Sequence, residues 1–570
     1  MEKKDQVVRM RPHHGHSAFR NEVLTTFTGL RCTSTGRKCD GYEFAKDQDI
    51  TKLSSSTSTA PPTSLPPTAS SQITRKTSRL PPEVFIRSST PTTSYLTQVF
   101  NGTVQERRAF HRFKYRTVPA FAGGSETEFW TSLVLRAATA EPVIREAVIA
   151  LGTLHEDYET NQGQYRQAVT ALAPNSSDSS LAATLYGKAI RGLYTRIDTV
   201  QGSGDTAHLA VIASIIFACF EVLRRNDMAA VMHYQNGMRE LMRQMNARDQ
   251  ARIEDKDVVV GTTEIVDENC PLMKAAPQDD LDRMLRVFAR YDVQACTFSK
   301  PKTEPLGVKL PAVPNLVRDV GLTEVRRYLD NLLIAVYQLV KSDLSMFRYW
   351  KDSEVSPAWL EKRDEAVKTF QGWLDVLEDA IPGDALTLRC HGITASKSIL
   401  GLILQVKIAM IMLRTCINCG EETTYDKFDA DFEEMVSRVE NLTKILGLRD
   451  GKPLDRETIP FSMELGVVHP LFFIAWKCRD YRIRRRAIAE LKKCGKEGVW
   501  EGPIMAVLAD RIAQVEEKDI QPGEAVPEQC RIHDMRKSVE YDERLIRVEM
   551  RIAEDSTWKN WTTLREAIPF

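Results

Sequence analysis

The stretch LAVIASIIFACFEVLR, residues 209–224, is nearly continuous in alanine, isoleucine, valine, phenylalanine and leucine. This composition predicts a helix that is buried on most of its sides, because an element that is apolar all round has no face suited to water. The longest apolar run, Ile399–Leu413, is broken by Gln405 and Lys407. It is too short and too polar to span a bilayer, so we expect a soluble body with no membrane partner.

Amphipathic spacing begins near Phe121 and continues toward the carboxyl end. Phe129, Trp130, Leu133 and Val134 fall at i, i+1, i+4 and i+5, which lays one apolar stripe along a helix. The same spacing continues through a second set of residues: Val143, Ala147, Val148, Leu151 and Leu154. The sequence therefore predicts consecutive helices in this part of the chain.

A further amphipathic helix is predicted over Glu324–Lys341, with Thr323 as its N-cap. Its inward face consists of five apolar residues: Leu329, Leu332, Leu333, Val336 and Val340. Strand-like alternation of useful length is scarce, and no repeat recurs at a fixed period. We therefore predict an all-α fold, with one large helical domain over residues 119–570 and its longest polar interruption at Val258–Asp279.

Residues 51 to about 100 form a tract rich in serine, threonine and proline, as in SSSTSTAPP at positions 54–62, within a predicted linker that spans 51–118. Such residues bury too little apolar area to offset the entropy of ordering, so we predict a disordered linker. Residues 1–118 hold 19 Lys and Arg against 9 Asp and Glu, and the rest holds 58 against 68. A basic arm joined to a mildly acidic body fits attraction to phosphate, although basic tails also occur without a nucleic-acid role.

The chain has 570 residues, of which 42% are hydrophobic and 27% charged, as is ordinary for a globular protein. Its 11 cysteines are scattered, and no apolar signal segment opens the sequence. This pattern favours a reducing compartment over a disulfide framework.

The segment CTSTGRKCDGY, residues 32–42, contains two cysteines separated by six residues. A closed zinc site needs four thiolate or imidazole ligands, and two zinc ions that share bridging cysteines need six thiolates. The segment resembles the end of the fungal Zn2Cys6 cluster, C-x2-C-x6-C, a loop, then C-x2-C-x6-C. On that alignment Cys32 and Cys39 stand at the fifth and sixth ligand positions, and Gly29 occupies the fourth.

The resemblance implies that Cys32 and Cys39 are zinc ligands and that Arg31, Arg37 and Lys38 contact DNA phosphates. The first half of the cluster, with its basic reading helix, is absent, so residues 1–50 are a degenerate remnant. We hypothesise that the start of the chain reflects a misplaced start codon or an unspliced intron. A single zinc held with a nearby histidine is disfavoured by the spacing, and two reduced thiols in an unfolded arm are the simpler alternative; the candidate histidines are His13, His14 and His16.

A second resemblance covers most of the body. Its blocks follow one another in order: 129–135, 147–156, 186–190, 218–224, 233–237, 288–295, 470–480, 484–487 and 497–500. These blocks look like the regulatory region of fungal Zn2Cys6 transcription factors, closest to the branch related to the aspercryptin-cluster regulator. The block PLFFIAWKCRD at 470–480 is the most specific.

Several groups of residues invite an enzymatic or metal-binding interpretation. His155 and Glu156 begin an H-E-x-x-H pattern, but position 159 is Glu159, so a metalloprotease site is incomplete. A local hydrogen bond or ion pair on a helix face explains them more simply. No Gly-rich phosphate loop, nucleophile elbow or dinucleotide fingerprint is present. We therefore predict no catalytic residues and no enzyme.

Clustered aspartates at Asp279, Asp280 and Asp282 resemble a diphosphate-binding motif, but Arg283 breaks its spacing. Acidic residues at a helix amino terminus are explained by the helix dipole. The lone pair Cys416 and Cys419 more simply marks the end of the apolar helix than a metal or redox site.

Five arginines crowd the segment 479–486: Arg479, Arg482, Arg484, Arg485 and Arg486. They could contact phosphate or an acidic partner. We favour pairing with acidic neighbours such as Glu464, Asp480 and Glu490, since charge runs are usually solvated faces.

The resemblance implies a nuclear, sequence-specific RNA polymerase II transcription regulator with zinc as cofactor if the complete cluster exists. Its expected partners are DNA with CGG-type half-sites, the transcription machinery and a second copy in a homodimer. DNA binding is expected to be impaired in this form. The alternative is a helical protein- or ligand-binding module without DNA binding, and an all-α enzyme is a third class that lacks a complete motif.

Overall fold

The computed structural model describes the chain from residue 102 onward, apart from short gaps. The described ranges are 102–122, 128–160, 177–199, 204–255, 280–298, 322–380, 393–418, 420–446, 448–449, 452–453, 461–555, 557–558 and 560–570. All of them belong to one compact unit, Pro91–Phe570. The predicted cluster remnant and most of the predicted linker lie outside the described residues, as does the polar interruption at 258–279.

The first part of the described chain is helical throughout. Its elements are α3 (Val104–Arg112), η2 (Phe113–Thr117), α4 (Val118–Ala122), η3 (Phe129–Val134), α5 (Leu135–Ala140), α6 (Pro142–Thr160), α8 (Ser177–Thr199), α9 (Gly204–Leu223) and α10 (Asp227–Asp255). Helix α3 starts inside the region predicted to be a disordered linker. The prediction of disorder is therefore wrong over residues 104–118. A capping box explains the start, because the Thr103 side chain accepts from the Glu106 backbone and the Glu106 carboxylate accepts from the Thr103 backbone.

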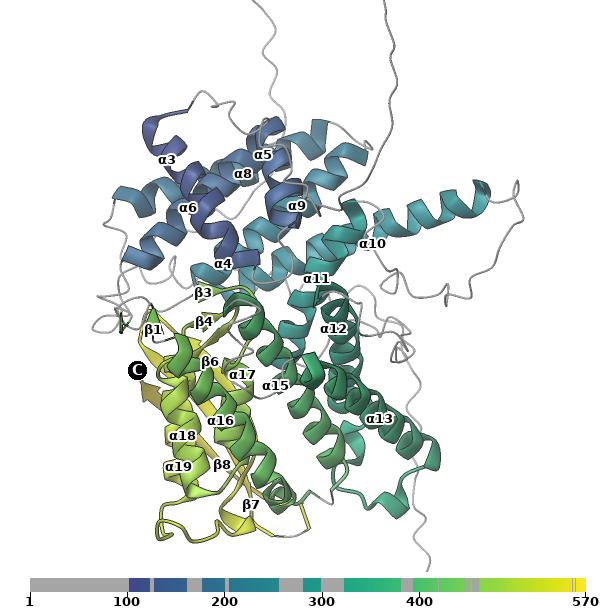
Figure 1. The fold of residues 1–570 in the computed structure, drawn as a ribbon, viewed down its shortest axis with the longest axis vertical. Helices are drawn as coiled ribbons and strands as arrows, with labels where there is room; N and C mark the ends of the chain where they lie inside the picture. Colours follow the sequence, from purple (N-terminus) through teal and green to yellow (C-terminus); the bar gives the residue numbers. More distant parts are fainter. Residues whose placement is uncertain are drawn as a thin grey trace, which may run out of the picture. The chain divides into compact units, whose positions relative to one another are not determined.

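Helix α9 is the buried helix that residues 209–224 predict. It packs against α6, α8, α10 and α11 (Figure 1). By length and composition Thr206–Leu223 could cross a membrane, and so could Lys397–Thr415, but each window is 83% buried by the rest of the fold. Both helices therefore serve as core helices here.

The middle of the chain adds further helices. They are α11 (Asp280–Phe298), α12 (Leu322–Gln338), η7 (Leu339–Asp343), η8 (Ser345–Phe347), η9 (Asp352–Glu354), α13 (Pro357–Ala380), α15 (Ile393–Thr415), η10 (Glu422–Phe428) and α16 (Asp429–Leu446). The predicted inward face of α12 is buried, apart from Val340, which is half-buried in η7. The helix starts at Leu322, so Thr323 lies within its first turn and not at the cap.

The two polar residues within the apolar run of α15 are satisfied by neighbouring elements. Gln405 donates to the Leu465 carbonyl oxygen at 2.6 Å, and Lys407 pairs with Glu434 at 2.5 Å. A core helix can carry such residues because each one finds a partner inside the fold.

Short helices and three small sheets complete the described part of the chain. The helices are α17 (Val468–Lys477), α18 (Tyr481–Leu491), α19 (Gly502–Glu516) and η11 (Glu528–Cys530). The strands are β1 (Leu448–Arg449), β2 (Lys452–Pro453), β3 (Phe461–Ser462), β4 (Lys496–Glu497), β5 (Trp500–Glu501), β6 (Ile532–Glu540), β7 (Leu545–Ala553) and β8 (Trp561–Pro569). The described part of the fold is thus mostly helical, as predicted, with small sheets that were not predicted.

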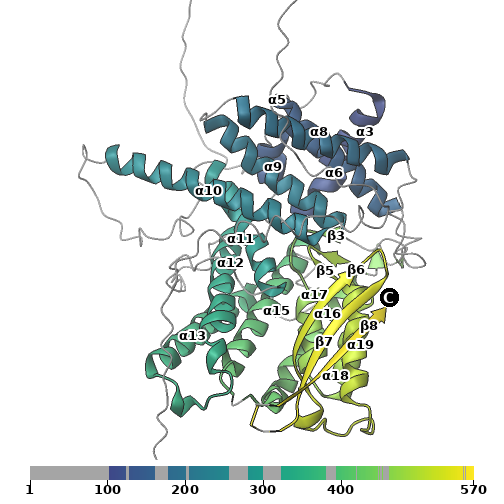
Figure 2. The same cartoon turned by 180° about the vertical axis from the view of Figure 1, so that it is seen from behind.

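The antiparallel sheet β6-β7-β8 is the largest of these sheets (Figure 2). Ile546, Val548 and Met550 alternate along β7 and are buried, because one face of the sheet packs against the helices. Helix α17 reaches the sheet through the Trp476 indole nitrogen, which donates to the Ile532 carbonyl oxygen at 3.3 Å. Helix α19 packs against β8.

The short hairpin β4-β5 contains the block EGVW at 497–500, and Glu497 pairs with Trp500. Gly498 has φ of 54°, and a Cβ atom there would lie 1.8 Å from Oε1 of Gln294. Glycine therefore meets two requirements at this turn. The hairpin places Trp500 in the core.

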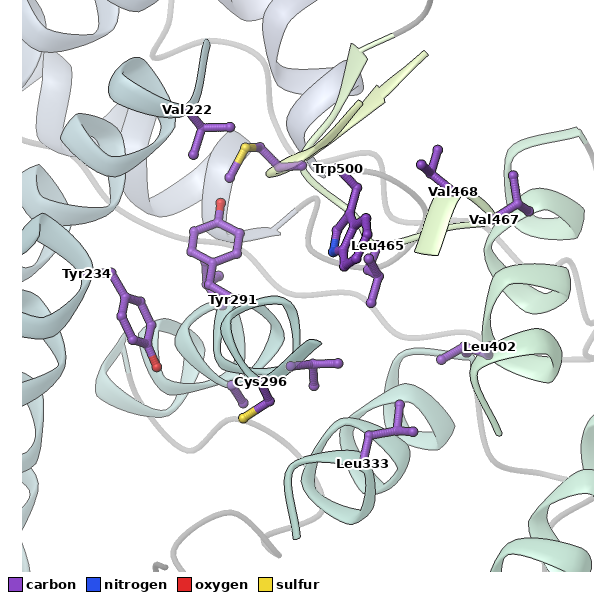
Figure 3. Close-up of a cluster of buried hydrophobic side chains, with 14 of the residues drawn as sticks. Val222, Tyr234, Tyr291, Cys296, Leu333, Leu402, Leu465, Val467, Val468 and Trp500 are labelled. Atoms are coloured by element: carbon purple, nitrogen blue, oxygen red, sulfur yellow. The ribbon is translucent and has the colours of Figure 1, made fainter. Parts of the chain in front are cut away.

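Figure 3 shows buried side chains around Trp500 that come from distant parts of the sequence. Tyr291 belongs to α11, Leu333 to α12 and Leu402 to α15, and all are buried. The helices of the amino-terminal and middle parts and the hairpin thus share one apolar core.

Candidate functional site

The predicted zinc and DNA residues lie outside the described part of the chain. They are Cys32, Cys39, Arg31, Arg37 and Lys38. Within the described ranges, no group of three or more His, Cys, Asp or Glu side chains could hold a metal ion. The structure therefore leaves these predictions untested.

His155 is a buried core residue. Its Nδ1 lies 3.1 Å from Oγ1 of Thr117, and its ring meets that of Phe121 edge-on at 5.7 Å. Burial, with the nearby Arg112 and Arg116, lowers the pKa of His155 to about 4, so its imidazole is neutral at pH 7. This environment supports the structural interpretation of the His-Glu pair.

The described aspartates of the second motif are ion-paired at the start of α11. Asp280 pairs with Arg136 at 2.5 Å and with Arg283 at 2.7 Å, and Asp282 pairs with Arg248 at 2.8 Å. Asp279 lies outside the described residues. These carboxylates serve helix start and packing.

Cys416 directly follows α15, at the predicted helix end, and Cys419 lies outside the described ranges. The Cys416 thiol is buried and donates to the Leu413 carbonyl oxygen at 3.0 Å. Burial raises the pKa of Cys416 to about 12, which argues against a reactive thiolate.

The arginine run 479–486 turns mainly into the fold. The side chains of Arg484 and Glu516 are fully buried and form an ion pair. Arg479 lies 3.0 Å from the other carboxylate oxygen of Glu516, and the Ile532 backbone N–H donates to that same oxygen at 2.7 Å. The carboxylate of Glu516 thus has charged partners on both oxygens.

A second buried carboxylate, Glu422, continues the arrangement. Lys477 lies 2.8 Å from its carboxylate, Arg479 3.1 Å and Arg348 3.0 Å. Burial alone would raise the pKa of Glu422, but these three cations outweigh it and lower the pKa to about 2. We call this set the glutamate network: Glu422, Glu516, Arg348, Lys477, Arg479 and Arg484.

The prediction that the five arginines pair with acidic neighbours such as Glu464, Asp480 and Glu490 is wrong. Glu464 instead binds Arg290 at 3.1 Å, Asp480 caps its own helix α18, and Glu490 pairs with Lys493. The arginines instead form ion pairs with carboxylates of η10, α16 and α19, which are distant in the sequence. Only the folded chain brings these elements beside α18.

A different buried polar group lies around Trp500. The Lys341 ammonium, at the end of α12 and η7, donates to the Thr297 carbonyl oxygen at 3.2 Å and lies 5.4 Å from the centre of the Tyr337 ring. The Thr297 hydroxyl accepts from the Trp500 indole nitrogen at 2.9 Å. Thr297 therefore binds both Lys341 and the core tryptophan.

Lys537 approaches Trp500 from strand β6, with its ammonium 4.7 Å from the indole. The His469 ring lies 5.0 Å from the Trp500 ring and 6.3 Å from the Tyr337 ring, between centroids. Three elements, η7, β6 and α17, thus bring basic side chains together. We call this set the lysine cluster: Lys341, Lys537, His469, Tyr337 and Trp500.

The ionisable groups of the lysine cluster disfavour their charged forms. Burial lowers the pKa of Lys537 to about 7, against the attraction of Asp227 and with the repulsion of Lys341. Burial lowers the pKa of Lys341 to about 8. Burial, with both lysines, lowers the pKa of His469 to about 3. No sequence motif signals this cluster, because its members lie in separate elements.

The blocks that resemble a regulatory region contact one another in the fold. The Tyr186 ring stacks on Phe220 at 4.1 Å, and its hydroxyl lies 2.9 Å from Nε2 of His233. The Cys219 thiol lies 3.2 Å from the Tyr291 hydroxyl. The blocks from α8, α9, α10 and α11 thus form one packed unit.

One curated protein resembles this chain. Over 219 residues the chain is 28% identical to the aspercryptin biosynthesis cluster-specific transcription regulator atnN of Emericella nidulans. The match covers 37% of this chain and 31% of that regulator, so it spans about a third of the relative's length. No family model matches, and no solved structure matches.

Proposed function

We propose that the chain is a sequence-specific RNA polymerase II transcription regulator of the fungal Zn2Cys6 type. The similarity to a pathway-specific transcription regulator carries this proposal. The zinc-cluster signature at 32–42 and the helical body behind a Ser/Thr/Pro tract agree with it. The helical body is then the regulatory domain, and the protein acts in the nucleus with the transcription machinery, as a homodimer on paired half-sites.

In this proposal Cys32 and Cys39 hold zinc, and Arg31, Arg37 and Lys38 contact phosphate. Two thiolates are too few for a two-zinc cluster, so DNA binding is impaired in this form. This shortage favours a second candidate function, a helical protein- or ligand-binding module that does not bind DNA.

Metal content separates the two candidates. Zinc bound by the purified full chain, and lost in the Cys32→Ser/Cys39→Ser variant, supports the cluster, whereas a chain without zinc supports the module. Substitution of Cys416, a buried thiol of the helical body, is the matched control.

A gel shift on DNA with CGG-type half-sites tests the recognition step. We expect weak binding by this chain and tighter binding by a chain in which a complete six-cysteine cluster precedes Gly41. If neither chain binds, the proposal that this protein recognises DNA is contradicted. Sequencing of the 5′ end of the transcript decides whether upstream cysteines exist.

A further inference from the structure

The sheet β6-β7-β8 has a second face, which points away from the helices. Figure 2 looks onto this face, and no described element crosses it there. Residues that are direct partners in the strand register point to the same face of a sheet. Two neighbouring rows of such partners cross the three strands on the outward face: Arg536, Glu549 and Arg565, and then Ser538, Arg547 and Ala567.

A groove of about 580 Å³ lies on this face, and the residues of both rows line it. Because these residues come from all three strands, the groove crosses the sheet. Ser538 and Ala567 are small and exposed, and they flank Arg547 in the second row. Their small side chains leave space on both sides of this arginine. The outward face therefore has room for an extended segment that lies across the strands.

The three arginines of the groove keep hydrogen-bond donors that face solvent. Arg536 is exposed and forms no ion pair within the described residues. Arg565 donates from Nε to Glu549 at 2.9 Å, and its two terminal nitrogens have no partner among the described residues. Arg547 uses two of its three nitrogens for carboxylates of the β6-β7 hairpin. A guanidinium group carries five N–H donors, so each arginine can bind a further carboxylate oxygen.

The charge pattern around the groove distinguishes between two kinds of anionic partner. Glu549 lies between Arg536 and Arg565 in the first row, and Glu540 and Glu543 lie beside Arg547. These carboxylates repel a nucleic-acid strand, because its phosphates carry a charge at every nucleotide. A peptide can instead place its acidic side chains opposite the arginines alone. The pattern therefore favours an acidic peptide over nucleic acid.

We propose that the outward face of the sheet binds an acidic peptide segment of a partner protein. Arg536 and Arg565 lie two strands apart, which separates their backbones by about 10 Å. A segment in the polyproline II conformation brings side chains i and i+3 to one side about 9 Å apart, so acidic residues at that spacing fit the two arginines. The site lies outside the predicted zinc and DNA residues and stands or falls separately from the proposed function.

A fluorescently labelled peptide that contains EAAE between glycines is the probe, and the same peptide with QAAQ is its neutral counterpart. We expect the EAAE peptide to bind the full chain saturably in fluorescence anisotropy at low salt, and added salt to weaken this binding. We expect the QAAQ peptide not to bind. Equal binding of the two peptides, or no saturable binding of the EAAE peptide, would overturn the proposal. Single-stranded DNA that binds these arginines more tightly than the peptide would also overturn it.

Substitutions of the arginines locate the binding. Arg536→Gln and Arg565→Gln should each weaken binding of the EAAE peptide roughly two- to fivefold, as loss of one exposed ion pair does. The triple variant that adds Arg547→Gln should weaken it roughly tenfold or more. Arg243→Gln is the matched control, because Arg243 is also an exposed, ion-paired arginine but lies on α10, and it should leave binding unchanged.

Glu549→Gln should change the affinity in the opposite direction. It removes the carboxylate that competes for Arg565, so we expect the EAAE peptide to bind roughly two- to fivefold more tightly. The thermal unfolding midpoint shows that each variant folds. Peptide binding that survives in the folded triple variant, or that weakens in Glu549→Gln, would contradict the assignment to this face.

Discussion

The glutamate network and the lysine cluster both hold charged side chains inside the fold, but the glutamates are fully buried, whereas Lys341 and Lys537 are partly buried and lie beside buried aromatic rings. In the glutamate network each carboxylate meets two or three cations within 3.1 Å. In the lysine cluster Lys341 is held by neutral carbonyl oxygens. The pKa values follow this difference: Glu422 is easier to ionise than usual, and both Lys341 and Lys537 are harder to protonate.

Burial lowers the stability of any isolated charge, and partners of opposite sign offset that loss. The glutamate network therefore acts as a structural joint that fastens η10, α17 and α19 to the start of β6. In the lysine cluster, burial outweighs the attraction of Asp227 for Lys537. Burial therefore decides the pKa values of the lysine cluster, whereas charged partners decide the pKa of Glu422 in the glutamate network.

The largest expected effect comes from breaking the joint. Glu516→Gln leaves Arg479 and Arg484 buried beside a neutral amide, so we expect the free energy of unfolding to fall by about 3–5 kcal/mol. Urea unfolding of the full chain measures the change. Glu549→Gln is the matched control, because its partner Arg565 is 75% exposed, and it should cost less than about 1 kcal/mol. Equal effects of the two variants would contradict the structural role of the joint.

Lowering the pH should reduce the free energy of unfolding through residues of both groups, in a different pH range for each. The pKa of His469 is lowered to about 3, so the unfolded chain binds a proton below pH 6.5 that the folded chain refuses. The pKa of His155 is lowered to about 4, so its contribution to stability is likewise lost between pH 6.5 and 4. Their contribution to stability is complete above pH 6.5 and is lost as pH falls.

The corresponding loss in the glutamate network begins at lower pH. Its Glu422 has a pKa of about 2, so its contribution is present above pH 4.5 and is lost toward pH 2. The free energy of unfolding from urea titrations between pH 6.5 and 4 should decline by roughly 1.4 kcal/mol per pH unit for each buried histidine. His469→Phe should flatten this decline, and an unchanged slope would show that His469 already accepts a proton in the fold.

The lysine cluster should respond to truncation in the opposite direction. Lys537→Met removes a partly buried ammonium and keeps the apolar stem, so we expect the free energy of unfolding to rise by about 1 kcal/mol at pH 7. The urea midpoint is the measurement. A loss of stability comparable to that of Glu516→Gln would mean that Lys537 is as well compensated as the glutamate network.

The smallest expected effect lies at the rim of the network. Arg486 binds Glu440 and Glu433 but is 32% exposed, so water screens these pairs. Arg486→Met should lower the free energy of unfolding by about 0.5–1 kcal/mol, and high salt should reduce the difference. A salt-independent loss of several kcal/mol would place Arg486 with the fully buried arginines.

The helices could be predicted because their signal is local. The apolar run of α9 and the inward leucines of α12 repeat at helical spacing, and the fold buries them. The end of α15 at Cys416 also follows from the sequence. In each case the residues that decide the structure are neighbours along the chain.

The sheet β6-β7-β8 was not predicted, although apolar and polar residues alternate along β7 as is typical of a strand. Ile546, Val548 and Met550 alternate with polar residues, as expected for a strand buried on one face. In β6 the inward row contains Lys537, and in β8 it contains Glu566, which binds Arg511 of α19 at 2.6 Å. Polar residues facing the core obscure the alternation, because their partners lie in other elements.

The two charged groups could not be predicted for the same reason. The five arginines are visible in the sequence, but their carboxylates come from elements that lie 30 or more residues away, as Glu516 does from Arg484. Whole helices separate Lys341, His469 and Lys537 along the sequence. These side chains come close to one another only when their three elements meet around Trp500 in the fold.

The central claim is that burial decides the charge of the lysine cluster, whereas charged partners decide that of the glutamate network. The protonation of the cluster lysines tests this most directly. Competitive acetylation of the full chain across pH, with each lysine quantified by mass spectrometry, reports the pKa of Lys537 and Lys341 against the exposed Lys368. The account predicts values near 7 and near 8 for the two cluster lysines. Values near the ordinary 10.5 would show that their charge is already balanced and would contradict the account.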